Sequence, residues 1–373
     1  MARDIGDLVR EIRSVSRSDK DKFLKQVDHQ IRLNFGLRFR QARNRVQGCN
    51  ERRSTMRFAR ETLMCTLKAS VLGYLALFVS ANATAQQTNC SGSIASTGTQ
   101  RVISIEGGGV ATRAKMNINI DGSGRAYART NAEAGALIHL CNAGEVFLPD
   151  GSSYQGSKDN ATCTGRFMDD FKRIGDAGWK DPTVGAIRWF GILGRDSARI
   201  GRRSIIGVKP VELVGSPGFY VSPTSLFDPA FSEDDQRRYT DPLVIPGGVM
   251  RNTEALKALG VKLGTFGVAI DTLRTDAEPV PFVVNDYGPR IGEGTVALAR
   301  LVAGKPIKED ITRAERFVGV VDTDDILWVL FGGNAMAPPY GAERVRAEAK
   351  AAFDGWGGAE RLKKCVTATA TSQ

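Results

Sequence analysis

Asp286 and Glu293 are the two side chains whose type and spacing most directly suggest acid–base chemistry. They lie seven residues apart in the sequence VVNDYGPRIGEGT. The apolar run at residues 280–284 predicts a short strand, Tyr-Gly-Pro predicts a turn, and Thr295 predicts the start of a helix that ends at Gly304. Across such a turn two carboxyl groups can face one cavity, as glycosidic hydrolysis requires. The alternative is that both residues are structural: the aspartate stabilises the turn, and the glutamate stabilises the helix N-terminus through its charge.

Four segments follow one another in the order of a known family. They are residues 116–122 (MNINIDG), 218–226 (GFYVSPTSL), 239–247, and 281–303, in which Ile-Gly-Glu-Gly-Thr precedes an Ala- and Leu-rich stretch. Together they resemble glycoside hydrolase family 75, the fungal-type chitosanases. The sequence departs from the family pattern in three ways: the interval between Asp286 and Glu293 is two residues shorter, Thr295 replaces a serine, and the segment at residues 141–207 is longer and richer in arginine.

The resemblance implies an endo-acting hydrolase that inverts the anomeric carbon and cleaves β-1,4 bonds of a glucosamine-containing polysaccharide such as chitosan, without a cofactor. It implies that Asp286 and Glu293 are the essential carboxylates. A helix N-terminus near Glu293 favours its ionised form and hence the role of base, leaving Asp286 as acid; the reverse assignment stays open. We expect further substrate-binding residues at the following positions: Asp121, Tyr220, Ser222, Thr224 and Tyr287. Ser225 offers another hydroxyl in the same segment as Ser222 and Thr224.

Two other functional classes remain open. A peptidoglycan-cleaving envelope enzyme would need one essential carboxylate and would release anhydro-sugars. A non-catalytic envelope protein would bind glycan on the same scaffold and show no hydrolysis. Analysis of the products distinguishes these classes from a two-carboxylate hydrolase.

The positive charge of the chain is concentrated at its N-terminal end. Residues 1–85 contain 17 Lys and Arg against 8 Asp and Glu, whereas the remainder has a net charge of +1, so the basic composition is no evidence for nucleic-acid binding. Residues 56–85 read as a secretory signal peptide, with a basic start, a twelve-residue uncharged run and an Ala-Thr-Ala cleavage site. The run is shorter than a membrane anchor needs. We therefore predict a secreted or periplasmic protein.

The signal peptide sets the remaining boundaries. Residues 1–55 are a basic extension, either upstream of a true start at Met56 or a cytosolic tail. Residues 86–100 form a polar leader, and residues 101–373 form a single catalytic domain with an insertion around residues 142–207.

Cysteine and histidine usage excludes some chemistry. Four cysteines follow the predicted cleavage site: Cys90, Cys141, Cys163 and Cys365. In an exported chain they can form two disulfides with three connectivities, of which a Cys141–Cys163 bridge is the most local. Their spacing does not fit a zinc site, and the chain has only two histidines. We therefore expect neither a metal centre nor a histidine-based triad.

Short strand-like runs separated by Gly, Pro and Asp dominate residues 101–373. Helical periodicity is clearest at residues 166–174, 295–303 and 342–353, the last ended by Gly355. This pattern predicts a mainly β fold with peripheral helices (α+β). By analogy we expect a compact six-stranded, double-psi-like β-barrel.

Overall fold

A computed structural model describes residue 90 and residues 92–97, 100–130, 135–156, 165–333 and 335–370. The chain divides into two compact units, Met1–Thr84 and Ala85–Gln373, and every described residue belongs to the second. The predicted N-terminal extension and the predicted signal peptide lie outside the described residues. Parts of the predicted polar leader also lie outside them.

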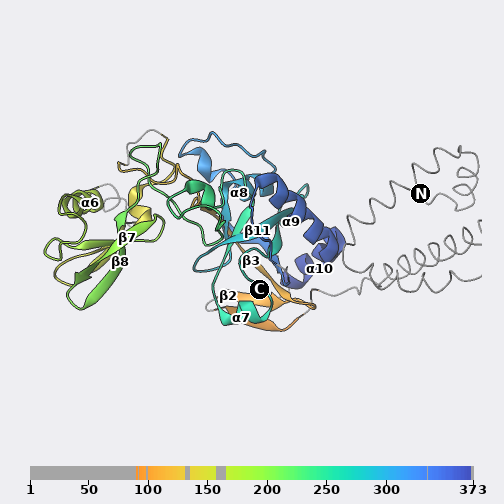
Figure 1. Cartoon of the computed structure of the whole chain (residues 1–373). Helices are drawn as coiled ribbons and strands as arrows, with labels where there is room; N and C mark the ends of the chain where they lie inside the picture. The colour runs from red at the N-terminus through yellow and green to blue at the C-terminus, as the bar shows by residue number, and fades with distance from the viewer. Residues whose placement is uncertain are drawn as a thin grey trace, which may run out of the picture. The chain divides into compact units, whose positions relative to one another are not determined.

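Six strands of the second unit close into a barrel (Figure 1). Around the ring they are β3 (Gly109–Asn119), β12 (Glu293–Thr295), β9 (Gly247–Met250), β11 (Val280–Tyr287), β10 (Phe266–Asp271) and β13 (Val321–Phe331), which pairs again with β3. The pairs β3–β12 and β9–β11 are parallel and the other pairs are antiparallel. The predicted mainly β fold with a closed six-stranded barrel is therefore confirmed.

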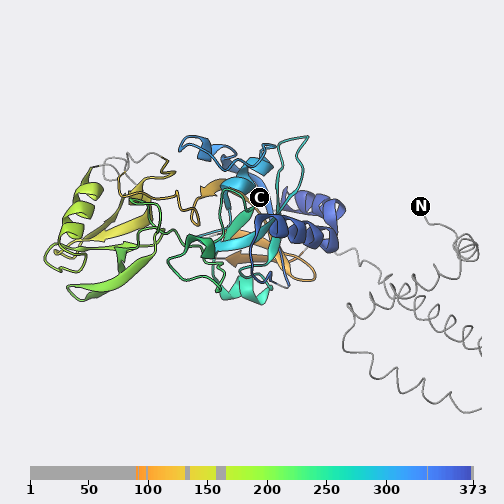
Figure 2. The ribbon, with the colours of Figure 1, turned by 45° about the horizontal axis from the view of Figure 1, so that its top comes forward.

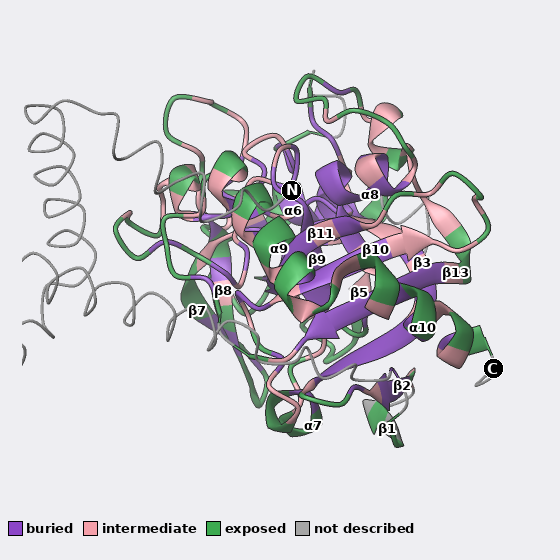
Figure 3. Ribbon diagram, turned by 90° about the vertical axis from the view of Figure 1, so that its right-hand side faces the viewer, coloured by how far each residue is buried: buried purple, intermediate pink, exposed green. Residues whose placement is uncertain are grey.

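Alternating side chains of these strands fill the barrel interior. Phe282 and Trp328 are fully buried there and meet edge to face, with ring centroids 5.5 Å apart. Met116, Val284 and Leu330 pack in the same cluster. Figure 3 shows the barrel strands as the most continuously buried part of the ribbon.

Two helices cover the outer side of the barrel, α9 (Ala342–Trp356) and α10 (Gly358–Ala370). Phe353 of α9 and Leu362 of α10 pack against Val268 and Val329 on strands β10 and β13. The predicted stop at Gly355 is wrong: α9 continues to Trp356 and ends at Gly357. The φ of Gly357, 122°, lies in a region that glycine adopts without strain.

The remaining helices are shorter. The helix α8 (Val296–Val302) begins where we predicted it, with the Thr295 hydroxyl accepting from Leu298 N at 3.2 Å. Further short helices are α7 (Glu254–Ala258) and the 3-10 helices η2 (Leu140–Ala143), η4 (Gln236–Arg238) and η5 (Glu315–Phe317). Across the described ranges, no helix combines the length and the apolar character needed to cross a membrane.

A second group of elements, which we call the lobe, is inserted between β3 and β9 (Figure 2). It contains a three-stranded sheet of β5 (Ser153–Gln155), β4 (Gly144–Phe147) and β6 (Ala186–Trp189), the hairpin of β7 (Gly194–Ile200) and β8 (Arg203–Pro210), and helix α6 (Arg166–Asp176). The predicted helix at residues 166–174 is thus present as α6. A backbone hydrogen bond from Leu193 N to Val221 O, at 2.8 Å, links the lobe to the segment that follows β8.

One disulfide joins the two ends of the described chain. Cys90 and Cys365 are bonded, next to the edge strands β1 (Ile94–Thr97) and β2 (Gln100–Ser104), which extend the sheet beyond β3. Cys141 is also disulfide-bonded, and Cys163, its predicted partner, lies outside the described residues.

Candidate active site

A β-bulge in β11 determines where Asp286 points. Val284 is in register with Gly248, but Asp286 is in register with Val249, so Asn285 is an extra residue in the strand. Val284 packs into the barrel interior, and without the bulge Asp286 would lie on that same side. Val249 faces outward because both of its neighbours in β9 face the interior. The bulge therefore turns Asp286 onto the outer side of the barrel.

Strand β12 places Glu293 across β9 from Asp286. Gly294 pairs antiparallel with the residue before Val249, so Glu293 lies opposite Val249. A Cβ on Gly294 would point inward, 3.3 Å from the ring of Trp328, so Glu293 points outward. Glu293 and Asp286 thus flank Val249 in one row on the outer side of the barrel.

The turn after β11 folds back over this row. A Cβ built on Gly288 would lie 2.5 Å from Cγ1 of Val249 and 3.6 Å from Oε2 of Glu293. A larger residue at this position would fill the space beside the Glu293 carboxyl. With β9 between them, the backbones of β12 and β11 are separated by two strand spacings, about 10 Å.

Four hydrogen bonds from uncharged donors hold the Asp286 carboxylate, which is only 7% exposed. Oδ1 accepts from Ser225 Oγ at 2.6 Å, from Tyr287 N at 2.8 Å and from Ser225 N at 2.9 Å. Oδ2 accepts from Asn119 Nδ2 at 3.3 Å. Oδ1 is therefore fully occupied, whereas Oδ2 keeps capacity for a further partner such as water.

A third carboxylate, Asp121, joins the pair from the turn that follows β3. Its Oδ1 accepts from the Tyr127 hydroxyl at 2.9 Å and lies 3.4 Å from Ser222 Oγ. Its backbone N donates to Asn119 Oδ1 at 2.8 Å. Asn119 therefore bridges the segment that carries Asp121 and the carboxylate of Asp286.

The three carboxyl groups affect one another electrostatically. Burial, and then the nearby Asp286, raise the pKa of Asp121 well above its usual range, and Glu293 adds to this effect. Burial raises the pKa of Asp286 in opposition to its hydrogen bonds. Carboxylates with raised pKa values in a shared site are characteristic of acid–base chemistry.

Glu293 has a different environment from Asp286. Burial raises the pKa of Glu293, the Arg290 guanidinium lowers it, and Asp286 raises it again. Among the residues that the structure describes, none donates a hydrogen bond to its carboxyl group. Glu293 therefore lacks the donors that favour the ionised form of Asp286.

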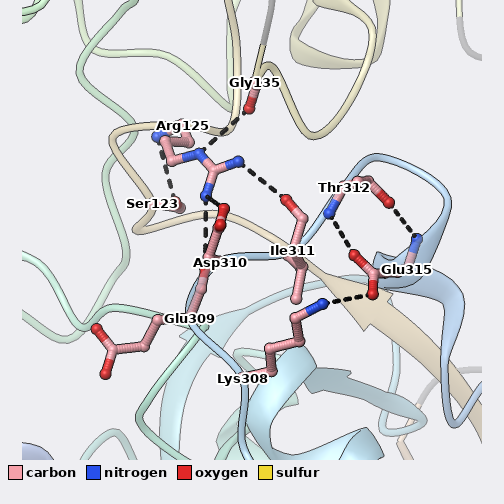
Figure 4. A network of polar contacts seen from close by, with 9 residues as sticks. All are labelled: Ser123, Arg125, Gly135, Lys308, Glu309, Asp310, Ile311, Thr312 and Glu315. Carbon is pink, nitrogen blue, oxygen red and sulfur yellow. Dashed lines mark hydrogen bonds and ion pairs between the residues drawn. The ribbon is translucent and has the colours of Figure 1, made fainter.

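Arg125 holds the segment that carries Asp121 in place (Figure 4). Its guanidinium donates to Ile311 O at 2.9 Å and to Gly135 O at 3.3 Å, and lies 3.5 Å from the Asp310 carboxylate. It therefore ties the segment after β3 to the segment after α8.

That second segment has its own fixed geometry. Thr312 and Glu315 cap each other reciprocally, through Thr312 N to Oε2 at 2.9 Å and Glu315 N to Oγ1 at 3.2 Å. Lys308 donates to the same glutamate at 2.6 Å. The support for Asp121 is thus built on an ordered turn rather than on a single contact (Figure 4).

The other expected substrate-binding residues have varied surroundings. Ser222 reaches Asp121, and Tyr287, half-buried, supplies a backbone donor to Asp286. The Thr224 hydroxyl is buried and donates to Leu226 O at 2.7 Å. The Tyr220 ring is buried among aromatic residues of the lobe. Within the described residues, neither Thr224 nor Tyr220 forms a hydrogen bond with one of the three carboxyl groups.

Two contributors, Asn119 and Tyr127, were not expected from the sequence. Asn119 lies two residues before Asp121 at a strand end, which is a weak signal for a site residue. Tyr127 sits in the run Arg-Ala-Tyr-Ala-Arg, which gives no indication that its hydroxyl donates to a carboxylate.

No group of three or more His, Cys, Asp or Glu side chains in the described ranges is arranged to hold a metal ion. Comparison with protein-family models finds no family that matches the chain, and comparison with curated proteins finds no match.

Proposed function

We propose that this protein is an endo-acting glycoside hydrolase that cleaves β-1,4 bonds of a glucosamine-containing polysaccharide, as its resemblance to the family 75 chitosanases suggests. The observation that carries the proposal is the row Glu293–Val249–Asp286, in which a half-buried and a buried carboxyl, both with raised pKa values, flank one strand. Glycosidic hydrolysis needs such a pair, one to supply a proton and one to accept a proton.

Glu293 is the better candidate for the general acid. Burial favours its neutral form, and within the described residues no hydrogen bond stabilises its anion. It then donates its proton to the glycosidic oxygen as the bond to the anomeric carbon breaks. This assignment reverses the one that the helix N-terminus favoured, because among the described residues four donors reach the Asp286 carboxylate and none reaches that of Glu293.

Asp286 is the better candidate for the general base. Four hydrogen bonds support its ionised form, and Oδ2 retains capacity to accept a proton from water. The water attacks the anomeric carbon from the face opposite the leaving oxygen. Each turnover therefore leaves Asp286 protonated and Glu293 ionised, and exchange with solvent restores both.

An inverting outcome follows if the carboxyl groups leave room for that water, which requires roughly 6.5–9.5 Å between them. An intervening strand is consistent with this separation, because the two backbones are about 10 Å apart. Direct attack by a carboxylate, as in retaining enzymes, needs a separation of only about 5 Å.

Asp121 completes the proposed site as a substrate-binding group. Burial and its neighbours favour its protonated form, which donates a hydrogen bond to a sugar hydroxyl. The Tyr127 hydroxyl and the bridge through Asn119 fix its position beside Asp286.

We also infer that the protein is exported. The disulfide between Cys90 and Cys365 supports this inference, because such bonds persist mainly in oxidising compartments. It agrees with the predicted signal peptide, after which no stable membrane anchor is expected.

The test is to incubate the full chain with soluble chitosan and to follow new reducing ends, with Glu293→Gln in parallel. We expect oligosaccharides of inverted anomeric configuration from the wild type and none from the variant. Activity that survives the substitution would remove Glu293 from the mechanism. A folded wild type that binds chitosan without cleaving it would instead support the glycan-binding class.

A further inference from the structure

A groove with a volume of about 610 Å³ runs along β3 next to the proposed site. We call it the basic groove. Its charged lining consists of four cations and two anions: Arg101, Arg113, Lys115, Arg290, Asp324 and Asp325. Its formal net charge is therefore positive, in contrast to the three carboxyls of the proposed active site.

The positive charge of the groove is not neutralised by ion pairs. Among the described residues, none of the four cations lies within salt-bridge distance of a carboxylate. The Arg113 guanidinium donates to Thr272 Oγ1 at 2.6 Å and to Thr369 Oγ1 and Val366 O at 3.3 Å, all of them uncharged acceptors. Arg113 is thus a fixed cation whose charge remains available to a ligand.

The groove and the proposed active site are neighbours along β3. Glu293 is in register with Asn117 on β3. Lys115 is two residues from Asn117 on the same side of that strand, and the backbone positions of these two residues are about 7 Å apart. Arg290 is close enough to lower the pKa of Glu293 while it lines the groove. A polysaccharide that lies along β3 past Glu293 would therefore reach the groove at Lys115.

The loop that connects groove and site is anchored at Ile291. The Gln100 side chain donates to Ile291 O at 2.9 Å and accepts from Ile291 N at 3.0 Å. Gly292 O accepts from Asn117 N at 2.9 Å. Arg290 and Glu293, at the two ends of this anchored segment, are therefore held in a fixed relation.

We propose that the basic groove binds a carboxylate substituent of the polysaccharide, so that an acidic amino-sugar chain is bound and cleaved in preference to the polycation chitosan. This inference rests on the proposed function and names its substrate class. A carboxylate gains charge-assisted hydrogen bonds from the groove cations. Protonated amines at the same place would be repelled, and a cleft of opposite charge also concentrates its ligand.

The inference is tested by binding, separately from hydrolysis. Full-length Glu293→Gln is titrated with three polymers that share a β-1,4 amino-sugar backbone: anionic carboxymethyl chitin, neutral glycol chitin and cationic chitosan. We expect carboxymethyl chitin to bind most tightly and chitosan least tightly. The preference should weaken as salt screens the groove charges.

A matched pair of variants assigns that preference to the groove. In the same background, Arg101→Gln/Lys115→Gln removes two groove charges, and Arg199→Gln/Arg202→Gln removes two charges from the lobe hairpin. We expect the groove variant to lose about fivefold in affinity for carboxymethyl chitin, while the hairpin variant changes little. Unfolding midpoints close to that of the parent protein establish that both variants are folded.

Two results would overturn the inference. One is that chitosan binds as tightly as carboxymethyl chitin. The other is that the two charge variants lose affinity equally, which would make the preference a property of net charge.

Hydrolysis by the wild type distinguishes the two proposals. If it cleaves all three polymers equally and the binding preference is absent, the proposed function stands and the acidic substrate is rejected. If the binding preference is present but no polymer is cleaved, the groove stands as a binding site and the hydrolase proposal fails.

Discussion

Asp170 in the lobe and Asp286 in the barrel are both buried aspartates, 9% and 7% exposed, yet their surroundings are opposite. Asp170 accepts from Arg173 Nη2 and from the Tyr154 hydroxyl, at 2.5 and 2.6 Å, and so has a cationic partner. Asp286 accepts only from uncharged donors. A cation offsets the cost of burial in the lobe, whereas in the barrel that cost appears as a raised pKa.

The contrast extends to neighbouring charges. The lobe pairs its charges, as in Arg188–Glu145 at 2.5 Å and Lys180–Asp196 at 3.4 Å. The barrel instead gathers three carboxyls whose charges oppose one another. Charge pairing serves the structure of the lobe, while the carboxyls of the barrel keep the proton affinity that the proposed acid–base chemistry requires.

The largest expected effect is on Asp286. Asp286→Asn retains the shape of the side chain but removes the base, so kcat should fall by a factor of about 10²–10⁴ while the unfolding midpoint stays at or above that of the wild type. Reducing-end assays and thermal unfolding measure the two quantities. Loss of folding together with activity would show that Asp286, like Asp170, is structural.

Asp170→Asn should show the reverse pattern. It leaves Arg173 without its anion, so the free energy of unfolding should fall by about 1–2 kcal/mol, with kcat changed less than about twofold because Asp170 does not touch the carboxyl row. Urea unfolding gives the first quantity. A large loss of kcat with unchanged stability would contradict the division between lobe and barrel.

Asp121→Asn should stabilise the protein near neutral pH. Because folding raises the pKa of Asp121, its favourable contribution is complete below the unfolded pKa and is lost as pH rises through the folded value. Asparagine imitates the neutral form at every pH. The unfolding midpoint of the variant should therefore match that of the wild type in acid and exceed it by roughly 2–4 °C at pH 7. An advantage that is independent of pH would argue against the raised pKa.

The smallest expected effect is a shift of a pH profile. Arg290 lowers the pKa of Glu293, so Arg290→Gln should raise it. If Glu293 is the acid, the alkaline limb of kcat/KM moves to higher pH, because the proton is retained longer. If Glu293 is the base, the acidic limb moves instead. Arg202→Gln, on the lobe hairpin, serves as the control that should move neither limb.

Sequence reasoning located features that depend on local pattern. The helices α6, α8 and α9 were predicted because apolar periodicity and the Thr295 cap are encoded within a few residues. Strand β12 was missed, since three residues, Glu-Gly-Thr, are too few to show alternation. The bulge at Asn285 was also invisible, because it is defined by register with another strand.

The roles of Asp286 and Glu293 also depend on residues that are distant in the sequence. Asp286 is supported by Ser225 and Asn119, which are 61 and 167 residues away in the sequence. No local pattern reveals such donors, so the sequence could bring Asp286 and Glu293 together but could not predict which one holds its proton.

The disulfide between Cys90 and Cys365 has a topological consequence. It spans 275 residues and so closes the folded unit into a covalent ring that contains barrel, lobe and proposed site. A protease that cuts one exposed loop of the ring opens it without releasing a fragment. Two cuts, or one cut followed by reduction, are needed before a part of the chain can diffuse away, so a single proteolytic nick leaves the folded unit in one piece.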